Sequence, residues 1–387
     1  MKRIADLKKR IETIIKSGEG KVNFPLSSFL STSSIFYGGA VKLRSAFYSK
    51  GIIRSKRLPC MVISVGNITL GGTGKTPMTI YTAQLIRQLG YKVVVISRGY
   101  KGGAEKIGGI VSNGSQIFMT SDEAGDEPFM MAQKLDQIPV IVGQDRFTSG
   151  MLAIREFDPQ VVILDDGFQH LKLLRDMDLV LLDYKRPFGN NHLFPRGVLR
   201  EPVSALLRGD AFILTRSDAP VPTAFNDHIP LTQGRPVFRS FHVARVYKVL
   251  KGKTIECDQE LLKGCKAYAF AGIARNDDFQ RTLKEFECNI KGFLDFPDHH
   301  RYSSSDIDKI LRSAKAAEAD VLITTEKDLA RITNQVIWPM DLMVVGIEVS
   351  FGTEADSFFD FIKSEIKNNW KMRARILIFV DIKINSM

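Results

Sequence analysis

A glycine-rich turn at residues 66–76 limits the possible folds of this chain more than any other feature. The turn follows a short apolar run at residues 61–65 and ends in Gly74-Lys75-Thr76, where a helical pattern begins. Glycines allow backbone N–H groups to surround phosphate oxygens, and a helix N-terminus adds positive potential. The sequence therefore predicts a phosphate-binding loop between a buried strand and a helix.

This loop carries the groups that a nucleotide site needs. Lys75 is expected to reach the β- and γ-phosphates, and the Thr76 hydroxyl is expected to bind Mg²⁺. Thr69 occupies the place of the first glycine in the general G-x-x-x-x-G-K-[ST] pattern, but phosphate binding is still expected. ATP is favoured over GTP because the chain has no N-K-x-D guanine signature. The residues predicted to bind ATP are Thr69, Leu70, Gly71, Gly72, Thr73, Gly74, Lys75 and Thr76.

From residue 61 onward, short apolar runs alternate with helical patterns. The runs lie at residues 61–65, 93–97, 140–142, 161–164, 179–182 and 211–214, and helices are expected at 76–89 and 127–135. This alternation predicts an α/β fold with a doubly wound, mostly parallel sheet of the P-loop NTPase type.

A second, smaller α/β unit is expected after the Pro- and Gly-containing segment at residues 220–236. Two β-like stretches, at 238–243 and 342–349, bracket this unit and could pair as a two-stranded linker. Inside the bracket, strands are expected at 267–271 and 321–324, helices at 277–285 and 306–317, and a closing helix follows at 351–366. The predicted parts are basic N-terminal helices at 1–57, a P-loop domain at 58–235, the smaller domain with its linker strands at 236–350, and a closing helix with a basic tail at 351–387.

The positive charge is concentrated at the N-terminus. The whole chain carries a formal charge of +11, and residues 1–57 contain 13 Lys or Arg and three acidic residues. Residues 1–16 form an amphipathic basic pattern, and residues 26–48 combine aromatic, apolar and basic side chains. Such segments fit a lipid surface, but they could instead pack on the protein body or bind nucleic acid. The sequence alone leaves these three alternatives open.

Several classes of protein are excluded by composition. No apolar run approaches the roughly 20 residues of a transmembrane helix. The four cysteines are far apart and form no C-x-x-C pair, so neither a disulfide framework nor a zinc module is expected. A reducing cytoplasm is the simplest location.

Charged residues beside predicted strand ends supply candidate catalytic groups. Asp165 and Asp166 directly follow the run at 161–164, so they are expected at the carboxyl edge of the sheet and are candidates for binding Mg²⁺. Candidate bases are Asp126 and Glu127, with Asp298, His299 and His300 in the second unit, and candidate cations are Arg98, Arg146 and Arg200. Taken singly, each also fits a helix cap or a surface ion pair.

Together, the motifs of this chain resemble those of the tetraacyldisaccharide 4′-kinase family of lipid A biosynthesis, over roughly residues 25–365. The matching segments are residues 64–69, Gly71-Gly72-Thr73-Gly74-Lys75-Thr76-Pro77, Ser97-Arg98-Gly99-Tyr100, Gly125-Asp126-Glu127-Pro128, Asp165-Asp166-Gly167-Phe168-Gln169-His170, Leu199-Arg200-Glu201-Pro202, Phe270-Ala271-Gly272-Ile273 and Thr325-Glu326-Lys327-Asp328. Thr69 is ordinary in this family.

The resemblance implies transfer of the ATP γ-phosphate to the 4′-hydroxyl of an acylated glucosamine disaccharide 1-phosphate. It implies Mg²⁺ dependence, two α/β domains with the site between them, and action at the cytoplasmic face of the inner membrane of a Gram-negative bacterium. Asp126 inherits the role of base with His299 as its partner, and Lys75, Arg146 and Arg200 are expected to stabilise charge. The metal region falls to Thr76, Asp165 and Asp166, and supporting or substrate-contacting places fall to Gln169, Glu127, Arg98 and Tyr100. A monomer with no nucleic-acid partner is expected.

Two other functions are alternatives to the kinase. One is a membrane-associated P-loop ATPase that acts as a nucleotide-dependent switch and hydrolyses ATP without a lipid acceptor. The other is a nucleic-acid-binding module that uses the basic N-terminus. Neither explains the motifs around Asp126 and Asp165.

Overall fold

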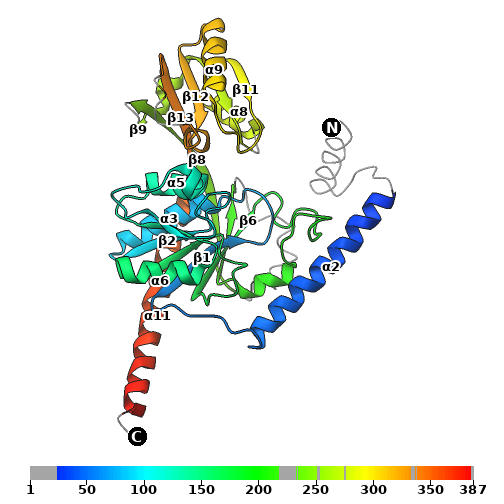
Figure 1. Cartoon of the computed structure of the whole chain (residues 1–387), viewed down its shortest axis with the longest axis vertical. Coiled ribbons are helices and arrows are strands. Elements are labelled where there is room, and N and C mark those ends of the chain that lie inside the picture. The colour runs from blue at the N-terminus through cyan, green and yellow to red at the C-terminus, as the bar shows by residue number, and fades with distance from the viewer. Residues whose placement is uncertain are drawn as a thin grey trace.

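The computed structural model describes residues 24–384, apart from residues 218–231, 233, 251–252, 274–275, 333–335 and 337. The amphipathic helix predicted at residues 1–16 lies outside the described residues. Within them, a single mixed sheet of 13 strands runs through both halves of the molecule, with helices on both faces (Figure 1). The predicted α/β fold is confirmed.

The first half of the sheet is parallel except at its outer edge. Its order is β7-β6-β1-β5-β2-β4-β3, and only β3 runs antiparallel to its neighbour. The bounds are β1 (Met61–Asn67), β2 (Val93–Ser97), β3 (Gly109–Ser112), β4 (Val140–Val142), β5 (Val161–Asp165), β6 (Met177–Asp183) and β7 (Ala211–Thr215). All six predicted runs form strands, because central parallel strands are buried on both faces and read as continuous apolar segments.

Successive residues of β1 enter different cores, since side chains alternate across a strand. Met61, Ile63 and Val65 pack with helices α3 (Lys75–Gln88), α5 (Asp126–Lys134) and α11 (Ala355–Ile384). Val62 packs on the other face with α6 (Arg146–Phe157). The sheet is thus covered on both sides, and the loops at its carboxyl edge are left for the site.

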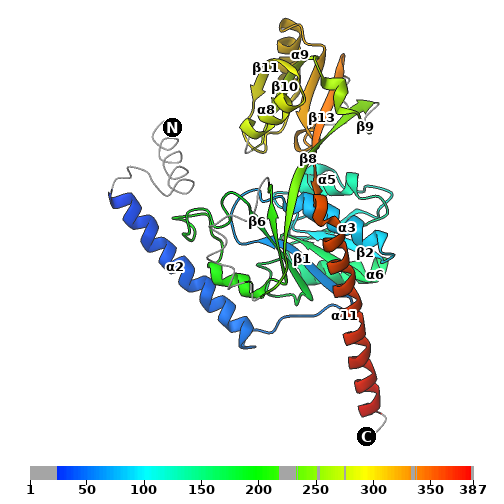
Figure 2. The ribbon, with the colours of Figure 1, turned by 180° about the vertical axis from the view of Figure 1, so that it is seen from behind.

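The two predicted linker strands pair with each other and also extend the sheet. Strand β8 (Val237–Leu250) is parallel to β7 at its start and antiparallel to β13 (Asp341–Ser350) further along. Beyond them lie β9 (Lys253–Cys257), β10 (Lys266–Ala271), β11 (Asn289–Asp295) and β12 (Val321–Thr325), with helices α8 (Asn276–Glu285), α9 (Ser304–Ala316) and α10 (Glu326–Leu329). Figures 1 and 2 show this second unit beyond β8, over the end of the first unit that carries α5. The residue boundaries predicted for the four parts remain predictions.

The closing helix differs from the expected one. It was expected at residues 351–366, but Gly352–Glu354 form a 3-10 turn, η4, and α11 runs from Ala355 to Ile384. No glycine or proline interrupts residues 355–384, so the helix has no local signal to end at residue 366. Phe358, Ile362 and Ile366 are fully buried against the first unit.

Elements that the sequence pattern missed lie mainly at exposed edges. Strands β9 and β11 carry alternating polar residues and end their sheet paths, while β3 is short and begins with Gly109. Helix α6 was not assigned, although Asp145 caps it by accepting hydrogen bonds from the amides of Phe147 and Thr148. Helix α4 (Ser121–Ala124) and the 3-10 turn η1 (Val203–Arg208) are short local features.

Helix α2 (Phe24–Ser49) lies along one side of the first unit, and Figure 2 shows it as a long rod apart from the sheet. It contains no acidic residue. Among the helices of the described part of the chain, none is both long and apolar enough to cross a membrane.

Candidate active site

The phosphate-binding loop joins the end of β1 to the start of α3. Gly74 ends it in the left-handed region, with φ of 84°, which a glycine adopts without strain. The Asn67 side chain, buried at the end of β1, donates a 2.8 Å hydrogen bond to the Thr73 hydroxyl, and the Lys75 Nζ lies 3.5 Å from Asn67 Oδ1. Asn67 therefore positions both the loop, through Thr73, and the Lys75 side chain.

Two neighbouring carboxylates stand beside the loop in different environments. Asp165 ends β5, is buried, and accepts hydrogen bonds from the hydroxyls of Thr79 (3.2 Å) and Ser97 (3.0 Å). Asp166 has φ of 52° and turns its partly exposed carboxylate toward two cations. The Lys75 Nζ lies 3.8 Å from it, and the Arg200 guanidinium donates to both its oxygens at 2.8–2.9 Å.

These environments move the two pKa values apart. Burial raises the pKa of Asp165 to about 6, and the charges of Glu127 and Asp166 add to the rise. Burial alone would also raise the pKa of Asp166, but Lys75 and Arg200 outweigh it and hold that pKa below its ordinary value. Asp166 is therefore the more firmly ionised carboxylate of the pair.

Arg200 and Gln169 link this pair to the phosphate-binding loop. The Gln169 side-chain amide donates to the Asn67 carbonyl at 2.7 Å, and its oxygen lies 3.4 Å from the Arg200 guanidinium. Arg146 instead is buried and donates to the carbonyls of Gly143 (2.7 Å) and Asp165 (3.4 Å). Burial lowers the pKa of Arg146 to about 10, so the guanidinium stays protonated at neutral pH.

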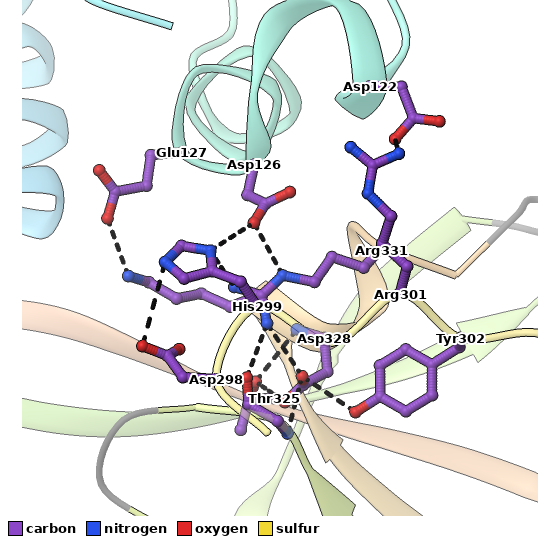
Figure 3. A network of polar contacts seen from close by, with 12 residues as sticks. Asp122, Asp126, Glu127, Asp298, His299, Arg301, Tyr302, Thr325, Asp328 and Arg331 are labelled. Atoms are coloured by element: carbon purple, nitrogen blue, oxygen red, sulfur yellow. Dashed lines mark hydrogen bonds and ion pairs between the residues drawn. The ribbon is translucent and has the colours of Figure 1, made fainter. Parts of the chain in front are cut away.

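The second unit supplies the partners of Asp126, which begins α5 (Figure 3). The His299 Nδ1 lies 3.1 Å from Asp126 Oδ2, and the Arg331 Nε donates to the same oxygen at 2.8 Å. Burial opposes ionisation of Asp126, but Arg331 and His299 together hold its pKa below the ordinary value. Asp126 of the first unit is thus bonded to both His299 and Arg331 of the second unit.

A buried hub holds this contact in the second unit. Asp328 is completely buried and accepts hydrogen bonds from the hydroxyls of Tyr302 (3.0 Å) and Thr325 (2.6 Å) and from the Gly272 amide (3.0 Å). Arg331 donates to Asp328 and, at 2.8 Å, to the Gly272 carbonyl. The amide of His299 donates to the same carbonyl, so the hub fixes the histidine and the arginine together.

Glu127 connects this contact with the phosphate-binding loop. The Lys327 Nζ donates to Glu127 at 2.9 Å and lowers the pKa of its carboxyl, against the effect of burial. Lys75 and Asp166 are close enough for their charges to act on Glu127 as well.

The predicted substrate-contacting residues Arg98 and Tyr100 make other contacts. Arg98 pairs with Glu105 at 2.7 Å and lies beside the exposed Tyr100 ring.

The family model for tetraacyldisaccharide-1-P 4′-kinase matches residues 26–367 of the chain. The chain belongs to the tetraacyldisaccharide 4′-kinase family. The member from Desulfatibacillum aliphaticivorans is 43% identical over 371 residues, which cover 94% of this chain and 99% of the relative. The member from Syntrophus aciditrophicus is 44% identical over 322 residues, which cover 80% and 86%. The resemblance inferred from the sequence is thus confirmed, and the chain is a kinase by family.

A solved structure agrees with the fold. The crystal structure of the "apo" form of LpxK from Aquifex aeolicus in complex with ATP is similar over 88% of this chain and 99% of that chain. The TM-score is 0.74 and the sequence identity is 33%. The family model ends at residue 367, so the last residues of α11 lie beyond the part that defines the family.

Several residues of the site were missed by sequence reasoning. Asn67, Thr79 and Ser97 position the loop and Asp165, but they are short polar side chains inside apolar strands or on a helix. Lys327 and Arg331 follow β12 and lie about 200 positions from Glu127 and Asp126 along the chain. Three of these residues lie in segments that match the family motifs: Asn67 in residues 64–69, Ser97 in Ser97-Arg98-Gly99-Tyr100 and Lys327 in Thr325-Glu326-Lys327-Asp328. The motifs alone give these residues no role.

We predict that Arg331→Met destabilises the protein much more than Arg301→Met. Arg331 is 3% exposed, and its loss leaves the buried Asp328 with an uncompensated charge. The expected cost is about 3–5 kcal/mol. Arg301 also reaches the first unit, through Asp122, but that ion pair is about two-thirds exposed, so about 0–1 kcal/mol is expected. Chemical unfolding of both variants measures the difference, and equal losses would contradict the assignment of Arg331 to a buried hub.

Proposed function

We propose that the chain, acting as a monomer, transfers the γ-phosphate of ATP to the 4′-hydroxyl of a tetraacyl glucosamine disaccharide 1-phosphate in lipid A biosynthesis. The observation that carries this proposal is the contact of Asp126 with His299 and Arg331. In this contact an ionised carboxylate of the first unit meets a histidine of the second unit. The next residue in the chain is Glu127, and the charges of Lys75 and Asp166 act on it. A hydroxyl acceptor held between the units would lie between a base and the phosphate-binding loop.

Asp126 is suited to accept the proton of the acceptor hydroxyl. Its Oδ2 is occupied by His299 and Arg331, and Figure 3 shows the other oxygen pointing away from both. We assign the proton to that second oxygen, Oδ1. Because both partners favour the ionised form, Asp126 is a weak but permanently available base at neutral pH. His299 and Arg331 then fix the direction of the carboxylate.

Lys75 and Arg200 are the cations placed to stabilise the transferring phosphoryl group. Both contact Asp166 in the structure, so both are already at the edge of the loop where the phosphates would bind. Cations held in place before the reaction stabilise developing negative charge without reorganisation. Arg146 acts further back by holding the main chain at Gly143 and Asp165.

The donor set beside the loop fits a Mg²⁺ ion. The described residues contain no group of three or more His, Cys, Asp or Glu side chains of the kind that an all-protein metal site uses. Mg²⁺ bound with a nucleotide instead takes one or two carboxylates, a hydroxyl and phosphate oxygens. The hydroxyl of Thr76 and the carboxylates of Asp165 and Asp166 would hold it. When bound, the ion neutralises charge on the phosphates.

Helix α2 is the part of the described chain that we assign to the membrane surface. Phe29, Phe36 and Leu43 are spaced seven residues apart, so they lie along one side of the helix, and each is at least 55% exposed. Basic residues and no acidic ones accompany them. An apolar stripe on a basic helix fits the headgroup region of an anionic bilayer, which we propose to be the inner membrane reached from its cytoplasmic face.

The decisive experiment is transfer of label from γ-labelled ATP to a tetraacyl disaccharide 1-phosphate in mixed micelles with Mg²⁺. We expect label at the 4′ position and at least a hundredfold slower transfer with Lys75→Ala, because a cation at the phosphates is lost. Circular dichroism checks that the variant is folded. Phosphate release without labelled lipid would instead support the switch ATPase.

Asp126→Asn is expected to lower kcat by about 10²–10⁴-fold and to leave the KM for ATP nearly unchanged. The amide keeps the shape of the side chain but cannot accept the hydroxyl proton. Asp122→Asn, four residues earlier on the exposed helix α4, is the matched control and should retain its activity. Parallel losses of kcat and ATP affinity in Asp126→Asn would indicate a structural role for Asp126.

Phe36→Asp is expected to weaken binding to vesicles of anionic phospholipid by about tenfold or more, since the change removes an apolar anchor and adds a negative charge. Ile107→Asp is the matched control, because Ile107 is at least as exposed but lies in the loop before β3. Vesicle flotation measures both. Equal binding by the two variants would exclude α2 as the lipid-facing helix.

A further inference from the structure

Helix α2 is attached to the first unit by side-chain hydrogen bonds to main-chain carbonyls. The Tyr37 hydroxyl donates to the Arg200 carbonyl at 2.9 Å, and the Ser34 hydroxyl donates to the Leu193 carbonyl at 2.8 Å. Lower on the helix, Arg44 donates to the Gln169 carbonyl at 3.1 Å. Carbonyls accept hydrogen bonds in preferred directions, so these three bonds restrain how α2 packs on the first unit, two of them through the loop at residues 193–200.

The loop at residues 193–200 is in turn bonded to the phosphate-binding loop. The Arg200 amide donates to the Ile68 carbonyl at 2.8 Å, and the Leu70 amide donates to the Val198 carbonyl at 2.6 Å. Thr69 and Leu199 form an antiparallel bridge between these bonds. A short two-stranded ladder therefore joins the first residues of the phosphate-binding loop to the segment that Tyr37 contacts.

Arg200 is where these connections meet. Its amide bonds to the phosphate-binding loop, its carbonyl accepts from Tyr37, and its guanidinium binds both oxygens of Asp166. The direction of its side chain depends on the orientation of its own peptide units. The Tyr37 bond restrains one of those units from the side of the surface helix.

The surroundings of Tyr37 keep its hydroxyl protonated and its ring packed, as the bond to Arg200 requires. Burial, followed by the charge of Glu201, raises the pKa of Tyr37, so the phenol remains a donor at physiological pH. Its ring packs edge-on against Phe194, with ring centroids 5.9 Å apart. Beside it, a Cβ on Gly38 would lie 2.7 Å from Leu193 Cδ1, which shows how closely the helix approaches the loop. The exposed Phe29 and Phe36 lie on another side of α2 than Ser34 and Tyr37, which bond to the loop.

We propose that Tyr37 is a positioning residue that couples the seating of α2 to the orientation of Arg200 and to the first residues of the phosphate-binding loop. This inference rests on the proposed role of Arg200 at the transferring phosphoryl group. Tyr37 touches neither Asp166 nor the loop glycines; it acts through the main chain of Arg200. Of the three bonds from α2, the Tyr37 bond is the one made directly to Arg200, so it is the most direct path by which a shift of α2 would reach the nucleotide site.

The test compares Tyr37→Phe with Thr32→Val in the full-length chain. Tyr37→Phe removes only the donor to Arg200, whereas the Thr32 hydroxyl donates within α2, to the Ser28 carbonyl, and serves as the matched control. We expect Tyr37→Phe to lower kcat for lipid labelling about two- to tenfold, the effect of one net hydrogen bond, with the KM for ATP unchanged. Thr32→Val should behave as wild type.

A double-mutant cycle separates positioning from general structural damage. If Tyr37 acts through Arg200, adding Tyr37→Phe to Arg200→Lys causes little further loss of kcat. Losses that multiply, or a Tyr37→Phe variant as active as wild type, would overturn the inference.

Amide hydrogen exchange tests the coupling without any turnover. We expect faster exchange at residues 193–200 in Tyr37→Phe but not in Thr32→Val, and unchanged exchange in Tyr37→Phe would also overturn the inference. Because this measurement needs no lipid acceptor, it stays informative if wild-type protein labels no lipid. That result would instead contradict the proposed function.

Discussion

Strand β8 is hydrogen-bonded to a strand of each unit, and the placement of the second unit depends on this sharing. Its first residues extend the parallel sheet beside β7, and its later residues pair with β13 in the antiparallel direction. Because both units share this long strand, the second unit lies beyond the carboxyl edge of the first unit's sheet. The segments after β11 and β12, which carry His299 and Arg331, are thereby brought to α5, where Asp126 and Glu127 begin the helix.

Three carboxylates at this junction are each paired with a cation from a distant part of the chain. Asp126 meets Arg331, Glu127 meets Lys327, and Asp166 meets Lys75 and Arg200. Desolvated carboxylates are costly unless they are paired or protonated. Asp165 differs from these three: its partners are hydroxyl groups, and burial raises its pKa. This environment supports the Mg²⁺-binding role that we propose for Asp165.

The sequence was sufficient for the fold class and for bringing the Asp165–Asp166 pair to the phosphate-binding loop, but not for the residues that support them in the first unit. Buried parallel strands appear as apolar runs, and residues at their carboxyl ends share an edge of the sheet, so the sequence alone places Asp165 and Asp166 beside Lys75. Edge strands such as β11 could not be found, since half of their surface faces water. Arg331 could not be matched to Asp126, because that contact depends on how two units stand relative to each other. The predicted end of α11 was wrong, because the sequence has no helix-ending residue near position 366.

A kinase whose acceptor is a lipid must bring a water-soluble nucleotide and a bilayer surface to one point. In this chain the nucleotide loop, the Asp166 carboxylate and the proposed lipid-facing helix converge on a single residue, Arg200, through its amide, guanidinium and carbonyl respectively. Three restraints act on this one residue, and the inferred coupling predicts that a change in one of them alters the other two. The side of α2 that bonds to the loop is not the side that carries Phe29, Phe36 and Leu43, so the helix can rest on lipid without breaking its bonds to the protein. In our proposal, contact with the membrane and order at the phosphate-binding loop both depend on the position of this one helix.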